Sequence, residues 1–139
     1  MQLALQCLGD SLRQKPSIHD VHRHPVIMSN PVTLEIGNHA PSFTCKDSAG
    51  NEHDLATYGT EGKTVILYFY PRDSTPGCTN QACDFRDNMG RLNNDDYVVL
   101  GVSKDSEKSH EKFIAKQELN FPLLMDTEGH LHELFGTWR

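Results

Sequence analysis

The feature that most constrains the fold is the run TVILYFY at residues 64–70, where β-branched and aromatic residues follow one another without polar alternation. Such a run is typical of a central strand that is covered on both faces. YVVLGVS at 97–103 predicts a second buried strand, and FPLLMD at 121–126 predicts a shorter third one. Buried strands that alternate with helices indicate an α/β protein with a largely parallel core.

Shorter elements are expected around these strands. The segment PSFTCKDSAGNEHDL predicts two short strands around the turn Asp47–Asn51. Helical segments are expected at three places: residues 76–93, 105–119 and 130–136. The second of these helices has Asp105 or Ser106 as its N-cap. The expected element order is β-β-β-α-β-α-β-α.

The first 30 residues differ from the rest of the chain. They include QKPSIHDVHRHPVIMSNP, which has no helical or strand period, so residues 1–30 are expected to form a mobile leader. Met28 is an alternative start, which would make the preceding residues non-native. Residues 31–139 are expected to form one domain.

The net charge of −6 argues against nucleic acid and anionic membranes as partners. No stretch is long and apolar enough for a membrane span, and the start is a poor secretory signal. The expected location is the cytoplasm, where the 4 cysteines would be reduced thiols.

The segment PRDSTPGCTNQACDFRD carries the clearest chemical signal. Thr75 is a good helix N-cap and Pro76 suits the first helical position, so Cys78 falls in the first turn. There the helix dipole and free backbone N–H groups stabilise a thiolate. Arg72 and Arg86 are near in sequence and would add positive charge. The pattern predicts a reactive cysteine.

A second cysteine, Cys83, follows Cys78 at a spacing that an intact helix keeps apart. Helix geometry places the two Cα atoms about 8.6 Å apart, whereas a disulfide needs them within about 7 Å. The two thiols therefore join only if the helix start unwinds, which Gly77 would ease.

Other interpretations of the cysteines and histidines stay open at this point. Taken alone, Cys83 is equally well a small buried residue of a helix face. The spacing C-x4-C is not that of a usual zinc pair, so no metal site is expected. Cys7 and Cys45 are expected to be inert. Five histidines are scattered and expected to be solvated: His39, His53, His110, His130 and His132.

Pro71, Thr75 and Cys78 fit the pattern P-x-x-x-T-x-x-C, and with it the chain resembles the peroxiredoxins of the alkyl hydroperoxide reductase/thiol-specific antioxidant family. The longer run YFYPRDSTPGCTNQACDFRD is similar to their Q-type subgroup, the bacterioferritin comigratory proteins. IGNHAPSFTCKDSAG, VVLGVSKDSEKSHEKFIAKQELNFPLLMD and ELFGTW are similar to the same subgroup in the same order. The resemblance covers about residues 34–139.

This resemblance implies a thioredoxin-like fold and a thiol peroxidase acting on hydrogen peroxide and organic hydroperoxides. Cys78 would be the peroxidatic cysteine, and Thr75 would hydrogen-bond its thiolate and the bound peroxide. Pro71 would shield the site, and the backbone N–H groups of Gly77 and Cys78 would help to hold the peroxide. Cys83 would be the resolving cysteine.

The resemblance further implies that the intramolecular disulfide is reduced by thioredoxin. No metal, haem or flavin is expected, and the complete domain would be a monomer. Two alternatives remain: a thiol-disulfide reductase or redox sensor, which the lack of C-x-x-C disfavours, and a catalytically impaired relative that acts as a binding module.

In one respect the sequence departs from the family pattern. Family members continue past the position of Trp138 with two strands and a helix, and that part supplies an arginine to the active site. Arg139 comes too early to be this arginine, so the domain is expected to be incomplete, truncated at its C-terminus: the chain is expected to be a fragment, with a weakened or inactive relative as the alternative. The strand at 64–70 would also lose a neighbour, so we expect an open sheet edge, with low solubility or a swapped dimer as its consequence.

Overall fold

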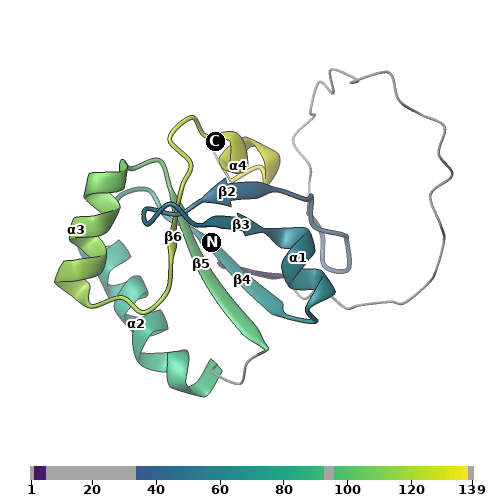
Figure 1. The fold of residues 1–139 in the computed structure, drawn as a ribbon, viewed down its shortest axis with the longest axis horizontal. Coiled ribbons are helices and arrows are strands. Elements are labelled where there is room, and N and C mark those ends of the chain that lie inside the picture. Colours follow the sequence, from purple (N-terminus) through teal and green to yellow (C-terminus); the bar gives the residue numbers. More distant parts are fainter. Residues whose placement is uncertain (1, 6–33, 93–95, 138–139) are drawn as a thin grey trace, which may run out of the picture.

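The computed structural model describes residues 2–5, 34–92 and 96–137 (Figure 1). Its main sheet has the strand order β1-β4-β5-β6, with β1 spanning Gln2–Leu5. The central strands β4 (Thr64–Phe69) and β5 (Tyr97–Ser103) run parallel, and β5 is also parallel to β6 (Leu123–Met125). The long apolar runs of the sequence therefore form the parallel core that they predicted.

A small antiparallel hairpin precedes β4, as the sequence predicted. It consists of β2 (Thr44–Lys46) and β3 (Glu52–Asp54). Asp47 shapes the turn because its Oδ1 accepts the backbone N–H groups of Ala49 and Asn51, both at 2.9 Å. Such side-chain bonds to nearby backbone groups are a usual reason for aspartate at a turn.

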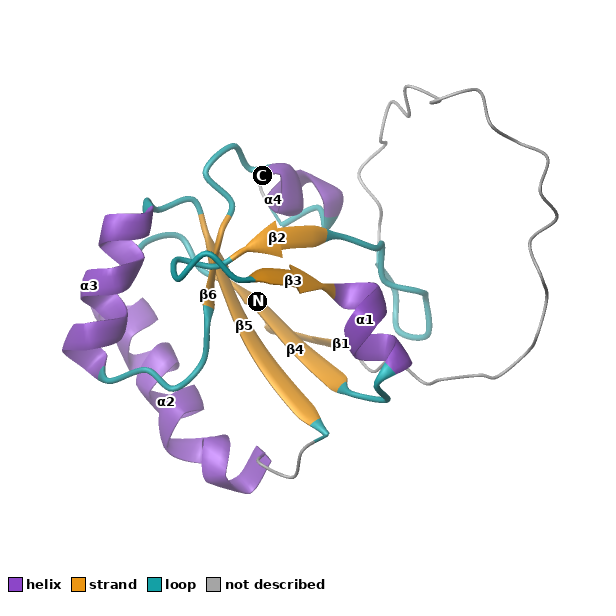
Figure 2. Ribbon diagram, viewed as in Figure 1, coloured by secondary structure: helices purple, strands orange, loops and turns teal. Residues whose placement is uncertain are grey.

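The described residues also form four helices, which Figure 2 shows in purple. They are α1 (Leu55–Thr60), α2 (Pro76–Leu92), α3 (Glu107–Gln117) and α4 (His130–Leu134). Ser106 is the N-cap of α3, one of the two residues predicted for that role. The sequence did not predict α1, whose N-cap Asp54 accepts the backbone N–H of Ala56 at 2.9 Å.

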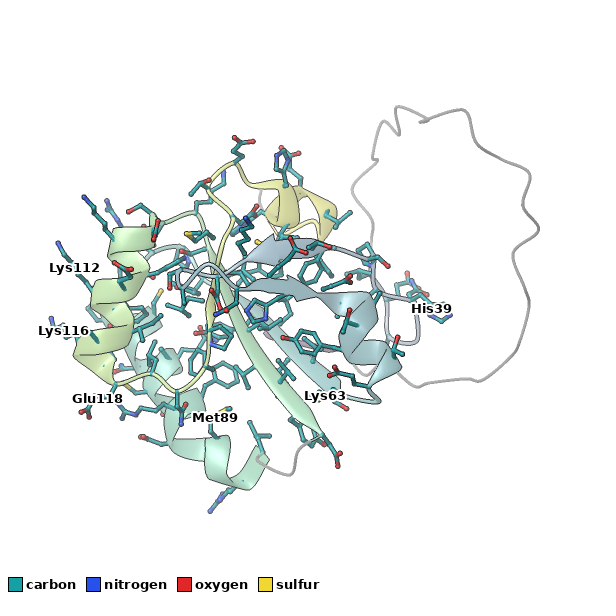
Figure 3. The ribbon with its side chains drawn as sticks, viewed as in Figure 1. His39, Lys63, Met89, Lys112, Lys116 and Glu118 are labelled. Atoms are coloured by element: carbon teal, nitrogen blue, oxygen red, sulfur yellow. The ribbon has the colours of Figure 1, made fainter. Side chains whose placement is uncertain are left out.

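Both faces of the main sheet are covered by apolar side chains. On one face, Tyr68 and Val99 pack with Phe85 of α2 and Phe113 of α3. Lys112 and Lys116 point outward from α3, so the opposite side of this helix faces the core (Figure 3). On the other face, Val65, Leu67, Leu100 and Val102 pack with residues of α1, α4 and the segment before β2. This double burial explains why β4 and β5 lack polar alternation.

The free edge that the sequence predicted for β4 is paired in the structure. Strand β1 (Gln2–Leu5) runs antiparallel to β4, from Gln2 opposite Tyr68 to Leu5 opposite Val65. The expectation of an open edge was therefore wrong, because the apolar residues at the chain start supply a pairing strand. Low solubility or a swapped dimer is then no longer expected, since both were consequences of the open edge.

Strand β1 falls within residues 1–30, which the sequence predicted to be a mobile leader. The other residues of that segment lie outside the described residues, as does Cys7. Within the described ranges, no helix has the length and apolar character needed to cross a membrane.

Gly101, in the middle of β5, lets two buried side chains approach the strand closely. A Cβ atom at this position would lie 2.7 Å from Leu123 Cδ2 and 2.8 Å from the Tyr68 hydroxyl. Tyr68 is only 1% exposed, so its ring has little room to move away. A glycine within a strand often marks such a close approach.

We expect Gly101→Ala to lower the free energy of unfolding by about 1–3 kcal/mol, because it overpacks the core. Gly90→Ala in α2 is the matched control, since a Cβ there meets nothing within 4 Å. In a helix that change should stabilise by roughly 0.5–1 kcal/mol. Urea unfolding of the two variants measures both effects, and equal stabilities would contradict the packing described.

Candidate active site

The connection between β4 and α2 carries the segment that the sequence predicted to be reactive. Pro76 is the first residue of α2, as predicted, and Cys78 lies in the first turn. The Thr75 carbonyl accepts the first hydrogen bond of the helix, from the Thr79 N–H at 2.8 Å. Cys78 therefore lies at the positive end of the helix dipole, beyond the carboxyl end of β4.

Thr75 occupies the N-cap position, but its hydroxyl does not cap the helix. The hydroxyl donates to the carbonyl of Arg72 at 3.1 Å, within the connection itself. Its oxygen keeps the capacity to accept hydrogen bonds. The sequence predicted the position of Thr75 correctly, whereas the direction of its hydroxyl depends on how the connection is folded.

Cys78 is buried against the apolar core, with 9% of its surface exposed. Its cluster includes the aromatic rings of Tyr68, Tyr70 and Phe85. The neighbouring residues Pro71 and Gly77 are exposed. Four predicted site residues thus share this one connection and the first turn that follows it: Pro71, Thr75, Gly77 and Cys78.

Cys83 lies further along α2 and is held against the end of α3. Its Sγ donates to Gln117 Oε1 at 3.6 Å. Arg86 contacts the same residue, because one of its terminal N–H groups donates to the backbone oxygen of Gln117, while its Nε pairs with Asp87 at 2.8 Å. Both cysteines are free thiols within one intact helix. They can join only after the start of α2 rearranges.

The two arginines expected to add charge near Cys78 have different surroundings. Arg86 is turned toward the end of α3 and interacts electrostatically with Cys83. Arg72 is exposed in the connection. The positive charge of Arg86 therefore lies beside the second cysteine rather than the first.

A buried polar cluster ties the connection to α3. The Tyr70 hydroxyl donates to Asp73 Oδ1 at 2.7 Å, and the Ser109 hydroxyl donates to Asp73 Oδ2 at 2.7 Å. His110 Nδ1 lies 2.8 Å from the same Oδ2. The backbone N–H of Asp73 donates to Asp105 at 2.6 Å. Asp73 is thus held by hydrogen bonds to both its carboxylate and its backbone N–H.

These hydrogen bonds set the charge of the cluster. Burial by itself would raise the pKa of Asp73, but the bonds from His110, Tyr70 and Ser109 outweigh it and hold that pKa below its usual range. Burial and the bond to Asp73 raise the pKa of Tyr70. The cluster therefore contains a carboxylate and a neutral phenol at neutral pH.

The expectation that five histidines are solvated was wrong for three of them. His110 is 0% exposed and His132 is 4% exposed. The Nδ1 atom of His132 lies 2.6 Å from Asp126 Oδ2, and His53, partly buried, lies 2.8 Å from Asp47. Each of these three histidines pairs with a carboxylate, and their positions in the sequence do not predict this pairing.

Cys45 has the surroundings of an inert thiol, as predicted. Its Sγ donates to the carbonyl of Met125 at 3.4 Å. Burial and the neighbouring charge of Asp126 raise the pKa of this thiol to about 11. Cys45 is therefore protonated and weakly nucleophilic at neutral pH.

The structure has a hollow of about 440 Å³ away from Cys78. It lies between the turn of the β2–β3 hairpin and residues 119–122, and both Asp47 and His53 line it. The carboxylate oxygens of Asp47 are engaged within the hairpin. Within the residues that the structure describes, no group of three or more His, Cys, Asp or Glu side chains is placed to hold a metal ion.

Comparison with known proteins gives consistent matches. A model of the AhpC/TSA family matches residues 36–139. Peroxiredoxin Bcp of Bacillus subtilis is 46% identical over 108 residues, which cover 78% of this chain and 68% of that protein. Peroxiredoxin Bcp of Escherichia coli is 42% identical over 105 residues, with 76% and 66% covered.

Solved structures agree with the sequence relatives. Peroxiredoxin Q of Xanthomonas campestris is similar with a TM-score of 0.65 and 37% identity, covering 70% of this chain and 60% of that one. Peroxidoxin BcpB of Mycobacterium tuberculosis has a TM-score of 0.67 and 32% identity, covering 72% and 64%. The predicted thioredoxin-like fold is thereby confirmed. The chain spans about two thirds of the length of its curated relatives.

We expect the environment of Cys45 to be visible in its alkylation by iodoacetamide. In the native protein the rate at Cys45 should rise about tenfold per pH unit from pH 7 to 9.5 without levelling off, because its pKa is raised to about 11. In urea the rate should level off above about pH 8.5, the usual range of a free thiol. Peptide mapping separates the cysteines, and a plateau near pH 8.5 in the native protein would contradict the burial.

Proposed function

The chain belongs to the AhpC/TSA family, and on that premise we propose that it is a thiol peroxidase reducing hydrogen peroxide and organic hydroperoxides. The observation that carries the proposal is Cys78 in the first turn of α2, directly after the Thr75–Pro76 helix start. Alkyl peroxide reduction is an activity of the bacterioferritin comigratory protein of Xanthomonas campestris, whose solved structure is 36% identical to this chain.

In the first step the Cys78 thiolate attacks one oxygen of the peroxide. The S–O bond forms while the O–O bond breaks, and the departing oxygen takes up a proton to leave as water or an alcohol. Cys78 becomes a sulfenic acid. The free N–H groups at the start of α2, including those of Gly77 and Cys78, stabilise the negative charge that develops on the departing oxygen.

Thr75 and Pro71 complete the site from the connection before α2. The oxygen of the Thr75 hydroxyl can accept a hydrogen bond from the bound hydroperoxide, because its own proton is directed to Arg72. Pro71 begins the connection and limits its freedom. No metal or organic cofactor takes part in this reaction.

In the second step the Cys83 thiol condenses with the sulfenic acid. A disulfide forms and one water leaves, so the protein loses two hydrogen atoms overall. For this step the first turns of α2 unwind and Cys83 leaves its contact with Gln117. A dithiol protein such as thioredoxin then reduces the disulfide by exchange, in the cytoplasm, where such reductants keep thiols reduced.

We expect one equivalent of hydrogen peroxide to remove two hydrogen atoms from the reduced protein and to link Cys78 with Cys83. Intact mass and peptide mapping measure the change. Cys78→Ser should abolish fast peroxide consumption, and Cys83→Ser should accumulate a sulfenic acid that dimedone traps. Cys45→Ser serves as the matched control and should react as the wild type does.

Two outcomes would contradict the proposal. If Cys78→Ser consumed peroxide at the wild-type rate, the assignment of the reactive cysteine would be wrong. If the reduced wild type were inert toward peroxide but reduced protein disulfides, the thiol-disulfide reductase would be the better function.

A further inference from the structure

We propose that Asp73 is a positioning residue, which holds the connection between β4 and α2 in the shape that presents Thr75 to Cys78. This inference rests on the thiol peroxidase function proposed above and adds to it a residue that does not touch the peroxide. Asp73 is five residues before Cys78 and two before Thr75. Its role is carried by its contacts, its burial and the backbone conformation of its neighbour.

Asp73 is bound from three directions. Its carboxylate, whose side chain is 2% exposed, accepts from Tyr70 at the end of β4 and from Ser109 and His110 in the first turns of α3. Its backbone N–H donates to Asp105, which also accepts the Ser103 hydroxyl at 3.1 Å. The middle of the connection is thereby fixed to α3 and to the end of β5.

His110 is itself held at both ends. Its ring is completely buried, and Nε2 lies 3.3 Å from the carbonyl oxygen of Leu124. The partner of Asp73 therefore cannot turn away without losing a second contact. A buried polar cluster whose members all have partners specifies one arrangement of the chain.

The residue that follows Asp73 has an unfavourable backbone conformation. Ser74 has φ 61°, which lies in the left-handed region that residues other than glycine rarely adopt. Among the described residues, Glu118 is the one other non-glycine residue in this region, and it ends α3, where that conformation is common. Ser74 precedes a helix instead, so its conformation needs outside support.

That support comes from both sides of Ser74: the hydrogen-bonded Asp73 precedes it and the start of α2 follows it. Ser74 lies in the turn between them, and its left-handed conformation sets where Thr75 and its hydroxyl lie. If Asp73 were released, Ser74 would relax toward an ordinary conformation and Thr75 would move. A displaced Thr75 slows a reaction that depends on exact placement before the peroxide arrives.

The test compares Asp73→Asn with Asp96→Asn. Asp96 is an exposed aspartate directly before β5 and serves as the matched control. Two rates are measured at Cys78: reaction with hydrogen peroxide, and alkylation by iodoacetamide, which needs only an accessible thiolate. We expect Asp73→Asn to slow the peroxide reaction at least tenfold while alkylation changes less than about twofold. The control should keep both rates. Equal losses in both reactions of Asp73→Asn would overturn the proposal.

A double-mutant cycle tests the role of Ser74. Glycine adopts the left-handed conformation without strain, so Asp73→Asn should lower the peroxide rate less in a Ser74→Gly background than in the wild type. The same loss in both backgrounds would contradict the role of Ser74. If Asp73→Asn fails to fold, Ser109→Ala replaces it, because Ser109→Ala removes one hydrogen bond to Asp73 and keeps the carboxylate. We then expect a smaller loss that still affects the peroxide reaction and not the alkylation. The absence of such a loss would contradict the proposal.

Amide hydrogen exchange over residues 74–79 separates this inference from the proposed function. Asp73→Asn should speed exchange there, while Asp96→Asn should not. If the wild type is inert toward peroxide, the thiol peroxidase function fails, and the exchange result alone decides whether Asp73 fixes the connection. Unchanged exchange would overturn the positioning role, whatever the peroxide rate.

Discussion

The burial of both faces of β4 and β5 is the constraint on which the rest of the structure depends. Val65 and Leu67 face one core while Tyr68 and Val99 face the other, so neither strand has a side left for polar chemistry. Polar groups therefore gather where the strands end. The connection after β4 takes up this role, because it leaves the sheet and must still satisfy its backbone groups.

The sequence predicted the parts of the fold whose signals are local. Unbroken apolar runs identified β4 and β5, and the Thr-Pro-Gly helix start placed the beginning of α2 correctly. Helix α1 was missed because its sequence, LATYGT, is short and contains a glycine, and its start depends on the Asp54 cap. Strand β1 was missed because QLAL is only four residues long and its role shows only against the edge of β4.

The candidate site likewise has local features that the sequence predicted and distant contacts that it did not predict. The spacing of Cys78 and Cys83 indicated that an intact helix keeps them apart, and the structure has both in α2. The polar cluster around Asp73 could not be predicted from the sequence, because His110 and Asp73 are 37 residues apart and each looks like an ordinary surface residue. The link between Cys83 and Gln117 spans 34 residues and is equally invisible in the sequence. Contacts between distant segments decide both.

The pairing of β1 with β4 also bears on the order in which the chain folds. Leu5 meets Val65, so this pairing closes a loop of about 60 residues, whereas β4, α2 and β5 are consecutive along the chain. The entropy lost on closing a long loop must be offset by contacts that already exist. The β4–α2–β5 unit is thus the natural nucleus, and β1 joins a sheet whose edge is already formed. The reactive connection lies inside that early unit, but its shape is complete only once Ser109 and His110 of α3 bond Asp73.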